Sequence, residues 1–190
     1  MDDKIIYRMD DDSDMKIAGV SDSAASDSAM DPESIDAYDR MRRSGELSRA
    51  RRLGASLADC IEDVFKSLAI KSSDETVLLH SKLLVIFSAV AAMESDLPNP
   101  MLARTALNVF YDTLKKDSPE LYDSMSVTGA VTFYYLEYRK LGVMPADIGG
   151  KFAMLCGREE DDALMSLGLD VFTRSFDHVR KIIDGMSFSG

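Results

Sequence analysis

Apolar residues recur at helical spacing along most of the chain after residue 31. The longest apolar stretch, residues 77–93, reads VLLHSKLLVIFSAVAAM, and its second half contains a single polar residue, a serine. A helix that is apolar around most of its circumference lies in a protein core or in a membrane. A spanning helix needs about 20 largely apolar residues, whereas the polar run HSK interrupts this stretch. We therefore predict a buried central helix over residues 74–95, packed inside other helices.

Residues that favour helix ends divide the rest of the chain into further helices. Asp31, Asn99 and Ser118 each precede a proline, a combination typical of a helix start. Ser72 and Glu75 have the spacing of a capping box at the start of the central helix. The predicted helices cover residues 32–43, 46–68, 74–95, 100–116, 121–141, 145–155 and 159–184.

The segment 127–138 fits two kinds of secondary structure. Its β-branched and aromatic residues suit a strand, but its apolar positions do not alternate. Tyr134, Tyr138 and Leu141 fall at helical spacing, so we predict a helix there, with a break near residues 126–129 as an alternative. The predicted fold class is therefore all-α, a single-domain bundle of six or seven helices around the central apolar helix.

Charge is divided unevenly between the start of the chain and the remainder. Residues 1–39 hold twelve acidic and three basic side chains, whereas the other 151 residues hold 21 acidic and 19 basic ones. The segment SDSAASDSA at residues 21–29 has too few apolar side chains to offset the entropy lost on ordering. We predict a disordered acidic N-terminal tail over residues 1–30 and a helical domain over residues 31–186.

Several features favour a cytoplasmic protein. The chain begins MDDKIIYRMDDD, without the basic segment and apolar run of a secretory signal. Its two cysteines, Cys60 and Cys156, lie far apart and outside any metal or redox motif, as expected in a reducing compartment. We expect a cytoplasmic protein that does not enter a membrane.

Motifs that carry catalysis are missing from the sequence. It contains no glycine-rich phosphate loop, no cysteine pair at metal spacing, no HExxH and no GxSxG. A di-metal site in a helical bundle needs a glutamate three residues before a histidine, and neither His80 nor His178 has one. We therefore expect no catalytic residues, no metal site and no cofactor, and a binding function in preference to an enzymatic one.

Arginine is concentrated near the start of the helical domain. Six of the twelve arginines lie between residues 40 and 52, in the segment RMRRSGELSRARR. Guanidinium groups bind carboxylates and phosphates through two parallel hydrogen bonds. The cluster is either a solvated face that pairs with the acidic tail, a contact for a protein or acidic segment, or a nucleic-acid contact. The candidate binding residues are Arg42, Arg43, Arg49, Arg51 and Arg52.

A second cluster is aromatic, with four rings within residues 133–138. One helix does not turn all four toward the core, so some tyrosine hydroxyls should reach the surface or line a groove. Core packing is the alternative role of these rings. The candidate pocket residues are Tyr134, Glu137, Tyr138 and Arg139.

Together these features predict a non-enzymatic helical protein-interaction or regulatory module. Its expected partner is another protein or an acidic segment, bound by the arginine cluster. Nucleic acid is a less favoured partner, because no other segment is rich in basic residues and the acidic tail repels a polyanion. The alternative is a small-ligand-binding or enzymatic helical domain with a tyrosine-rich pocket.

Overall fold

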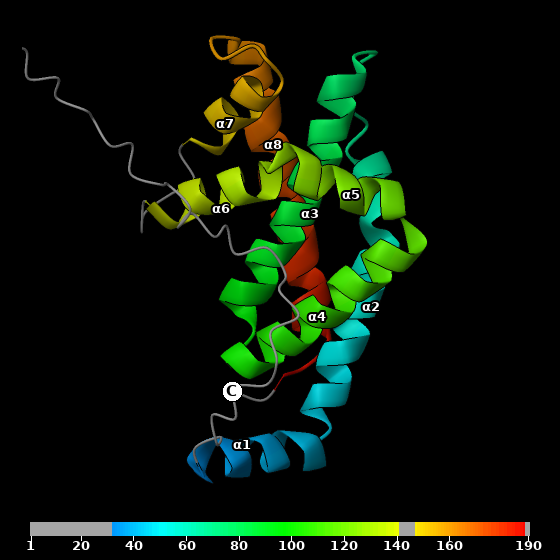
Figure 1. The fold of residues 1–190 in the computed structure, drawn as a ribbon, viewed down its shortest axis with the longest axis vertical. Coiled ribbons are helices and arrows are strands. Elements are labelled where there is room, and N and C mark those ends of the chain that lie inside the picture. The colour runs from blue at the N-terminus through cyan, green and yellow to red at the C-terminus, as the bar shows by residue number, and fades with distance from the viewer. Residues whose placement is uncertain (1–31, 141–146, 189–190) are drawn as a thin grey trace, which may run out of the picture.

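The computed structural model describes residues 32–140 and 147–188, which form α-helices joined by short connections. This confirms the predicted all-α fold, while the tail predicted for residues 1–30 lies outside the described residues. Figure 1 shows the eight helices of the described ranges. They are α1 (Pro32–Arg43), α2 (Glu46–Ser67), α3 (Glu75–Asp96), α4 (Pro100–Asp117), α5 (Pro119–Thr128), α6 (Ala130–Lys140), α7 (Ile148–Leu155) and α8 (Asp162–Gly185).

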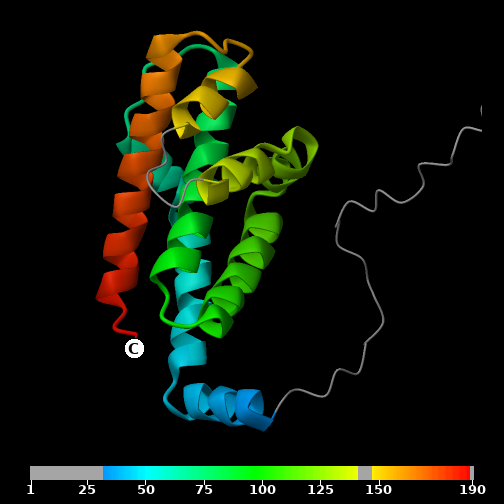
Figure 2. The same cartoon turned by 90° about the vertical axis from the view of Figure 1, so that its left-hand side faces the viewer.

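The long helix α3 occupies the centre of the bundle, as predicted (Figures 1 and 2). It contacts α2, α4, α6, α7 and α8, and every residue from Leu83 to Met93 is buried. Each fully enclosed large side chain, such as Ile86 or Phe87, stabilises the fold by about 1.5–3 kcal/mol. Among the described helices, α3 is the one long and apolar enough to cross a membrane, yet 78% of its apolar window is buried inside the bundle.

The start of α3 is fixed by Asp74. Its backbone is extended, and its Oδ1 accepts hydrogen bonds from the N–H groups of Thr76 (2.9 Å) and Val77 (3.4 Å). Ser72 Oγ instead accepts a hydrogen bond from the N–H of Asp74 at 3.1 Å. The capping box predicted for Ser72 and Glu75 was therefore wrong, because the aspartate nearer the helix satisfies its free N–H groups.

Gly129 divides the segment predicted as one helix into α5 and α6, which brings the number of described helices to eight. Its φ of 62° lies in the left-handed region, which glycine adopts without steric cost. Its N–H donates to the carbonyl of Met125 at 3.1 Å. The helical prediction for residues 127–138 and the alternative of a break near 126–129 are both confirmed. After this turn α6 runs across α3, as Figure 2 shows.

Aromatic packing holds α6 against the centre of the bundle. The ring centroid of Phe87 in α3 lies 5.6 Å from that of Tyr134 and 5.9 Å from that of Tyr138, both in α6. Phe87 also stacks on Phe172 of α8, with centroids 5.8 Å apart. Offset and edge-on contacts of this kind are favourable beyond the area they bury. They join α3, α6 and α8, and thereby fix where the remaining side chains of α6 are placed.

Candidate functional site

The arginine cluster lies at the junction between α1 and α2. Helix α1 ends at Arg43 and α2 begins at Glu46, and between them Gly45 has a left-handed φ of 75°. Figures 1 and 2 both show α1 lying across the end of α2. We call this surface the arginine corner; it consists of Arg42, Arg43, Arg49, Arg51 and Arg52.

Four members of the arginine corner are exposed, all except Arg49. Within residues 32–140 and 147–188, no carboxylate forms an ion pair with any of the five. Three arginines elsewhere in the bundle are paired: Arg158 lies 2.7 Å from Asp74, Arg174 lies 3.1 Å from Asp170, and Arg180 lies 2.6 Å from Asp96. The guanidinium groups of the four exposed arginines therefore have no carboxylate partner within the described part of the chain.

Arg49 has a structural role in this corner. Its Nη1 donates to the carbonyl of Ser44 at 3.3 Å, and its Nε is buried without a hydrogen-bond partner among the described residues. Ser44 Oγ in turn donates to the buried carboxylate of Glu46 at 3.0 Å. Arg49 therefore belongs to the turn between the helices, and the surface open to a partner consists of the other four arginines.

The structure separates the four residues predicted to line a tyrosine-rich pocket. Tyr134 is fully enclosed (0% exposed), Glu137 is buried, and Tyr138 is half-buried against Phe87. Burial raises the pKa of Tyr134 far above its usual range. Arg139, in contrast, is exposed and lines a surface groove. The helical spacing of the tyrosines identified a shared face of α6, and that face is turned toward α3.

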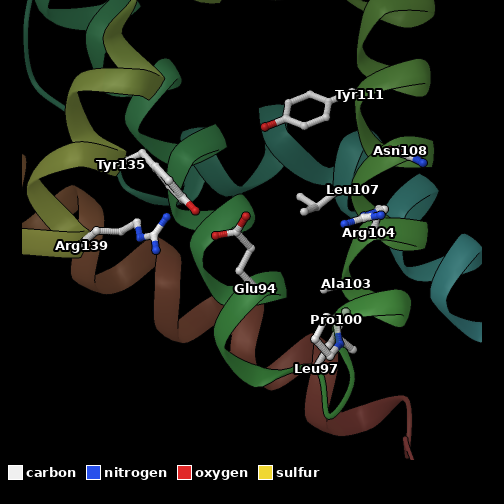
Figure 3. A pocket seen from close by; sticks show the side chains of 10 residues that line it. All are labelled: Glu94, Leu97, Pro100, Ala103, Arg104, Leu107, Asn108, Tyr111, Tyr135 and Arg139. Atoms are coloured by element: carbon white, nitrogen blue, oxygen red, sulfur yellow. The ribbon is translucent and has the colours of Figure 1, made fainter. Parts of the chain in front are cut away.

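The groove that contains Arg139 lies between α4 and α6, with the end of α3 between them (Figure 3). Its volume is about 880 Å³, within the range of small-molecule sites. We call it the α4–α6 groove. Its lining residues are Glu94, Leu97, Pro100, Ala103, Arg104, Leu107, Asn108, Tyr111, Tyr135 and Arg139.

Arg104 and Glu94 were missed by sequence reasoning. The groove residues of α4 recur at intervals of three and four, so they form one face of that helix. The sequence of α4 therefore shows a stripe of mixed polarity, formed by Arg104, Leu107 and Tyr111. Nothing in the spacing of α4 places this stripe opposite Arg139, because that juxtaposition depends on how α4 and α6 pack on α3.

Several polar groups project into the α4–α6 groove in Figure 3. They include the hydroxyls of Tyr111 and Tyr135, the carboxylate of Glu94 and the guanidinium of Arg139. Burial, together with the nearby charge of Glu94, raises the pKa of Tyr111 to about 12. The guanidinium carbon of Arg139 lies 5.5 Å from the ring centre of Tyr135, a favourable cation–π arrangement. With Arg104 on the α4 wall, the groove presents two guanidinium groups and one carboxylate.

A second hollow continues the groove along α4. Its volume is about 660 Å³, and it shares Asn108 and Tyr111 with the α4–α6 groove. Tyr122 and Met125 of α5 and Val131 of α6 line its far part. The two hollows are therefore neighbours along α4, with Asn108 and Tyr111 lining both.

The two cysteines and His80 lie outside the α4–α6 groove. The described ranges hold no group of three or more His, Cys, Asp or Glu side chains suited to a metal ion. Burial raises the pKa values of Cys60 and Cys156, which keeps both thiols protonated near neutral pH. His80 is buried, and burial lowers its pKa. None of these three residues lines the α4–α6 groove, whose lining provides binding groups.

Comparisons with models of known protein families, with curated proteins and with solved structures find no match to this chain. Two surfaces of the bundle carry groups suited to binding a partner or ligand. The arginine corner presents cations alone, whereas the α4–α6 groove presents charges of both signs around apolar side chains.

Proposed function

We propose that this protein is a helical interaction module that binds an acidic segment of another protein through the arginine corner. The observation that carries the proposal is that, in the described ranges, none of its four exposed arginines pairs with a carboxylate. Charge-assisted hydrogen bonds between guanidinium and carboxylate groups are short and directional. The guanidinium donors therefore form stronger hydrogen bonds to a partner that bears several carboxylates than they form to water.

The geometry of the corner supports recognition of an extended acidic segment. Arg42 and Arg43 end α1, whereas Arg51 and Arg52 lie on the second turn of α2. Gly45 and the hydrogen bond from Arg49 to Ser44 hold the junction between these helices. Cations placed on two packed helices discriminate between partners by geometry as well as by charge.

The acidic N-terminal residues are a built-in competitor in this proposal. They precede α1 directly, and residues 1–31 hold nine acidic against three basic side chains. A segment joined to its target has a high effective concentration there, even when each contact is weak. An external partner must therefore displace the protein's own acidic residues, which makes binding adjustable by salt and by modification of that segment.

The test uses the full chain and a fluorescent Asp- and Glu-rich peptide, with binding followed by fluorescence anisotropy. A variant in which the four exposed arginines are changed to glutamate should bind at least about tenfold more weakly. Arg49 is left in place because it holds the turn. The substituted residues are Arg42, Arg43, Arg51 and Arg52.

A matched control separates the arginine corner from net charge. It reverses four exposed lysines on other parts of the surface, so the net charge changes by the same amount. This control should keep most of its affinity for the acidic peptide. An equal loss of affinity in both variants would show that binding depends only on net charge, which would contradict the proposal. The control substitutions are Lys66→Glu, Lys71→Glu, Lys116→Glu and Lys181→Glu.

Duplex DNA is the second ligand in the same assay. Nucleic-acid binding depends steeply on salt, because binding releases counterions. Tighter binding to DNA than to the peptide, lost in the arginine variant, would assign the corner to nucleic acid instead.

The cytoplasm is the compartment we propose for this protein. The proposal is supported by Cys60 and Cys156, which are both free thiols.

A further inference from the structure

Three charged residues face the α4–α6 groove from three different helices. Arg104 belongs to α4, Arg139 to α6 and Glu94 to α3. In the part of the chain that the structure describes, none of the three forms an ion pair or a side-chain hydrogen bond. All three are exposed, so their charged groups remain available to a ligand in the groove.

Apolar side chains separate these charges. Leu97, Ala103 and Leu107 line the same groove. Leu97 and Ala103 are buried and Leu107 is half-buried, so they form a firm apolar surface. The hydroxyls of Tyr111 and Tyr135 add neutral hydrogen-bonding groups at its edge. The groove therefore combines an apolar surface, two cations, one anion and two neutral donors.

We propose that the α4–α6 groove binds a small apolar zwitterion, an α-amino acid or a dipeptide with large apolar side chains. The carboxylate of the ligand pairs with Arg104, and its ammonium group pairs with Glu94, which lies between Arg104 and Arg139 (Figure 3). Its apolar side chain covers Leu107 and the neighbouring apolar surface. This site is separate from the arginine corner, and the proposal does not depend on the partner of that corner.

Charge complementarity selects this class over simpler ligands. A purely anionic ligand such as phosphate pairs with an arginine but meets the carboxylate of Glu94, and like charges at close range repel. A neutral apolar ligand removes water from three charges without pairing them, which is unfavourable. A zwitterion is the smallest class of molecule that pairs with an arginine and with the glutamate at once.

The length of the ligand distinguishes the two members of the class. A free amino acid occupies the α4–α6 groove alone, beside Arg104 and Arg139. A dipeptide also extends past Tyr111 into the second hollow, toward Tyr122 and Met125. Because apolar burial adds affinity roughly in proportion to area, a dipeptide should bind more tightly if it is the true ligand.

The experiment titrates the isotope-labelled full chain with L-phenylalanine and with L-phenylalanyl-L-leucine, followed by amide NMR shifts. A ligand of this size should have a dissociation constant on the order of 0.1–1 mM. N-acetyl-L-phenylalanine lacks the ammonium group and L-phenylalaninamide lacks the carboxylate, so each should bind at least about tenfold more weakly. Absence of binding by both zwitterions up to about 10 mM overturns the proposal.

Variants then locate the site. Arg104→Gln should weaken binding of L-phenylalanine several-fold, and Arg139→Gln, on the far side of Glu94, should weaken it less. Arg51→Gln, on the arginine corner, should leave it unchanged. Glu94→Gln should remove the preference for L-phenylalanine over its N-acetyl form. All four positions are exposed, so thermal unfolding should match that of the unmodified protein.

Three results contradict the proposal even if L-phenylalanine binds. Binding that is unaffected by Arg104→Gln and Arg139→Gln would place the ligand elsewhere. If the unmodified protein binds L-phenylalanine and its N-acetyl form equally well, Glu94 does not bind the ammonium group of the ligand. Inorganic phosphate that binds more tightly than either zwitterion would make the groove an anion site.

Discussion

The backbone of Gly54 in α2 lies directly against the backbone carbonyl of Ala106 in α4. A β-carbon at residue 54 would overlap that oxygen and would lie 3.0 Å from the backbone nitrogen of Phe110. Both helices are therefore held at a separation that only glycine permits. Because the outer face of α4 carries Arg104, this crossing also sets one wall of the α4–α6 groove.

The variant Gly54→Ala should destabilise the protein by about 1–3 kcal/mol, because the atoms it meets are backbone and do not move aside easily. The matched control is Gly185→Ala at the end of α8, where an added β-carbon meets no atom within 4 Å. The control should change stability by less than about 0.5 kcal/mol. Urea unfolding compares the two, and equal stability would contradict the close crossing.

Asp74 should stabilise the start of α3 mainly as a helix cap. Its Oδ1 accepts from two backbone N–H groups, while its Oδ2 lies 2.7 Å from Arg158. Asp74→Ala removes both interactions and should reduce the free energy of unfolding by about 1–2 kcal/mol. Asp74→Asn retains an oxygen for the cap and loses only a half-exposed ion pair, for a loss below about 1 kcal/mol. Equal losses would assign the effect to the ion pair.

Tyr134 carries a buried hydroxyl that has no hydrogen-bond partner among the described residues. Tyr134→Phe keeps the ring against Phe87 and removes the unsatisfied group. Its stability should be unchanged or higher by about 1 kcal/mol. Tyr134→Ala, which also loses the ring, should reduce stability by about 3–5 kcal/mol. Chemical unfolding measures both, and a clear loss in Tyr134→Phe would show that the hydroxyl is bonded.

Tyr111 should make the protein less stable at alkaline pH. Its pKa is raised to about 12 by burial and by Glu94, whereas an unfolded tyrosine titrates near 10. Between about pH 10 and 12 the unfolded chain releases a proton that the folded chain keeps, so the free energy of unfolding falls as pH rises. The contribution of Tyr111 to the free energy of unfolding is complete below about pH 10 and amounts to about 2.7 kcal/mol at most.

Tyr111→Phe isolates this effect. It removes the titrating group, so the loss of stability between about pH 9 and 11 should be smaller than in the unmodified protein. Urea unfolding at the two pH values measures the difference. An identical alkaline loss in both proteins would show that the proton of Tyr111 is not held more tightly in the folded state.

Removal of residues 1–30 should strengthen binding of an acidic peptide to the arginine corner. The removed segment is the acidic competitor, so we expect a gain of about three- to tenfold in anisotropy titrations at low salt. The gain should shrink as salt rises. A chain of full length with the tail aspartates changed to asparagine is the control: it should gain as much as the deletion, and no gain would exclude charge as the cause.

Helix boundaries were predictable where neighbouring residues decide them. Asn99 precedes Pro100, and its Oδ1 accepts from the N–H of Met101 at 2.7 Å, so α4 begins where the sequence indicated. The start of α3 was harder, because both Ser72 and Asp74 carry suitable acceptors and spacing alone does not choose between them. The backbone conformation of the connection between α2 and α3 decides which side-chain oxygen reaches the free N–H groups.

The groove was not predictable in the same way. Glu94, Arg104 and Arg139 are ordinary solvent-facing positions on their own helices, and only tertiary packing brings them to one hollow. Two features produce it: the left-handed turn at Gly129 and the ring contacts of Phe87. Periodicity groups residues by face, but the direction of that face is set by partners distant in the chain.

The position of α3 has a consequence for synthesis of the chain on the ribosome. Among the described helices, α8 packs most extensively on α3, yet it is the last of them to be made. Until then a newly synthesised chain exposes an apolar helix long enough to cross a membrane. Such surfaces are prone to aggregate and are recognised by chaperones. The helix that organises the finished fold is therefore the segment most in need of protection while the chain is incomplete.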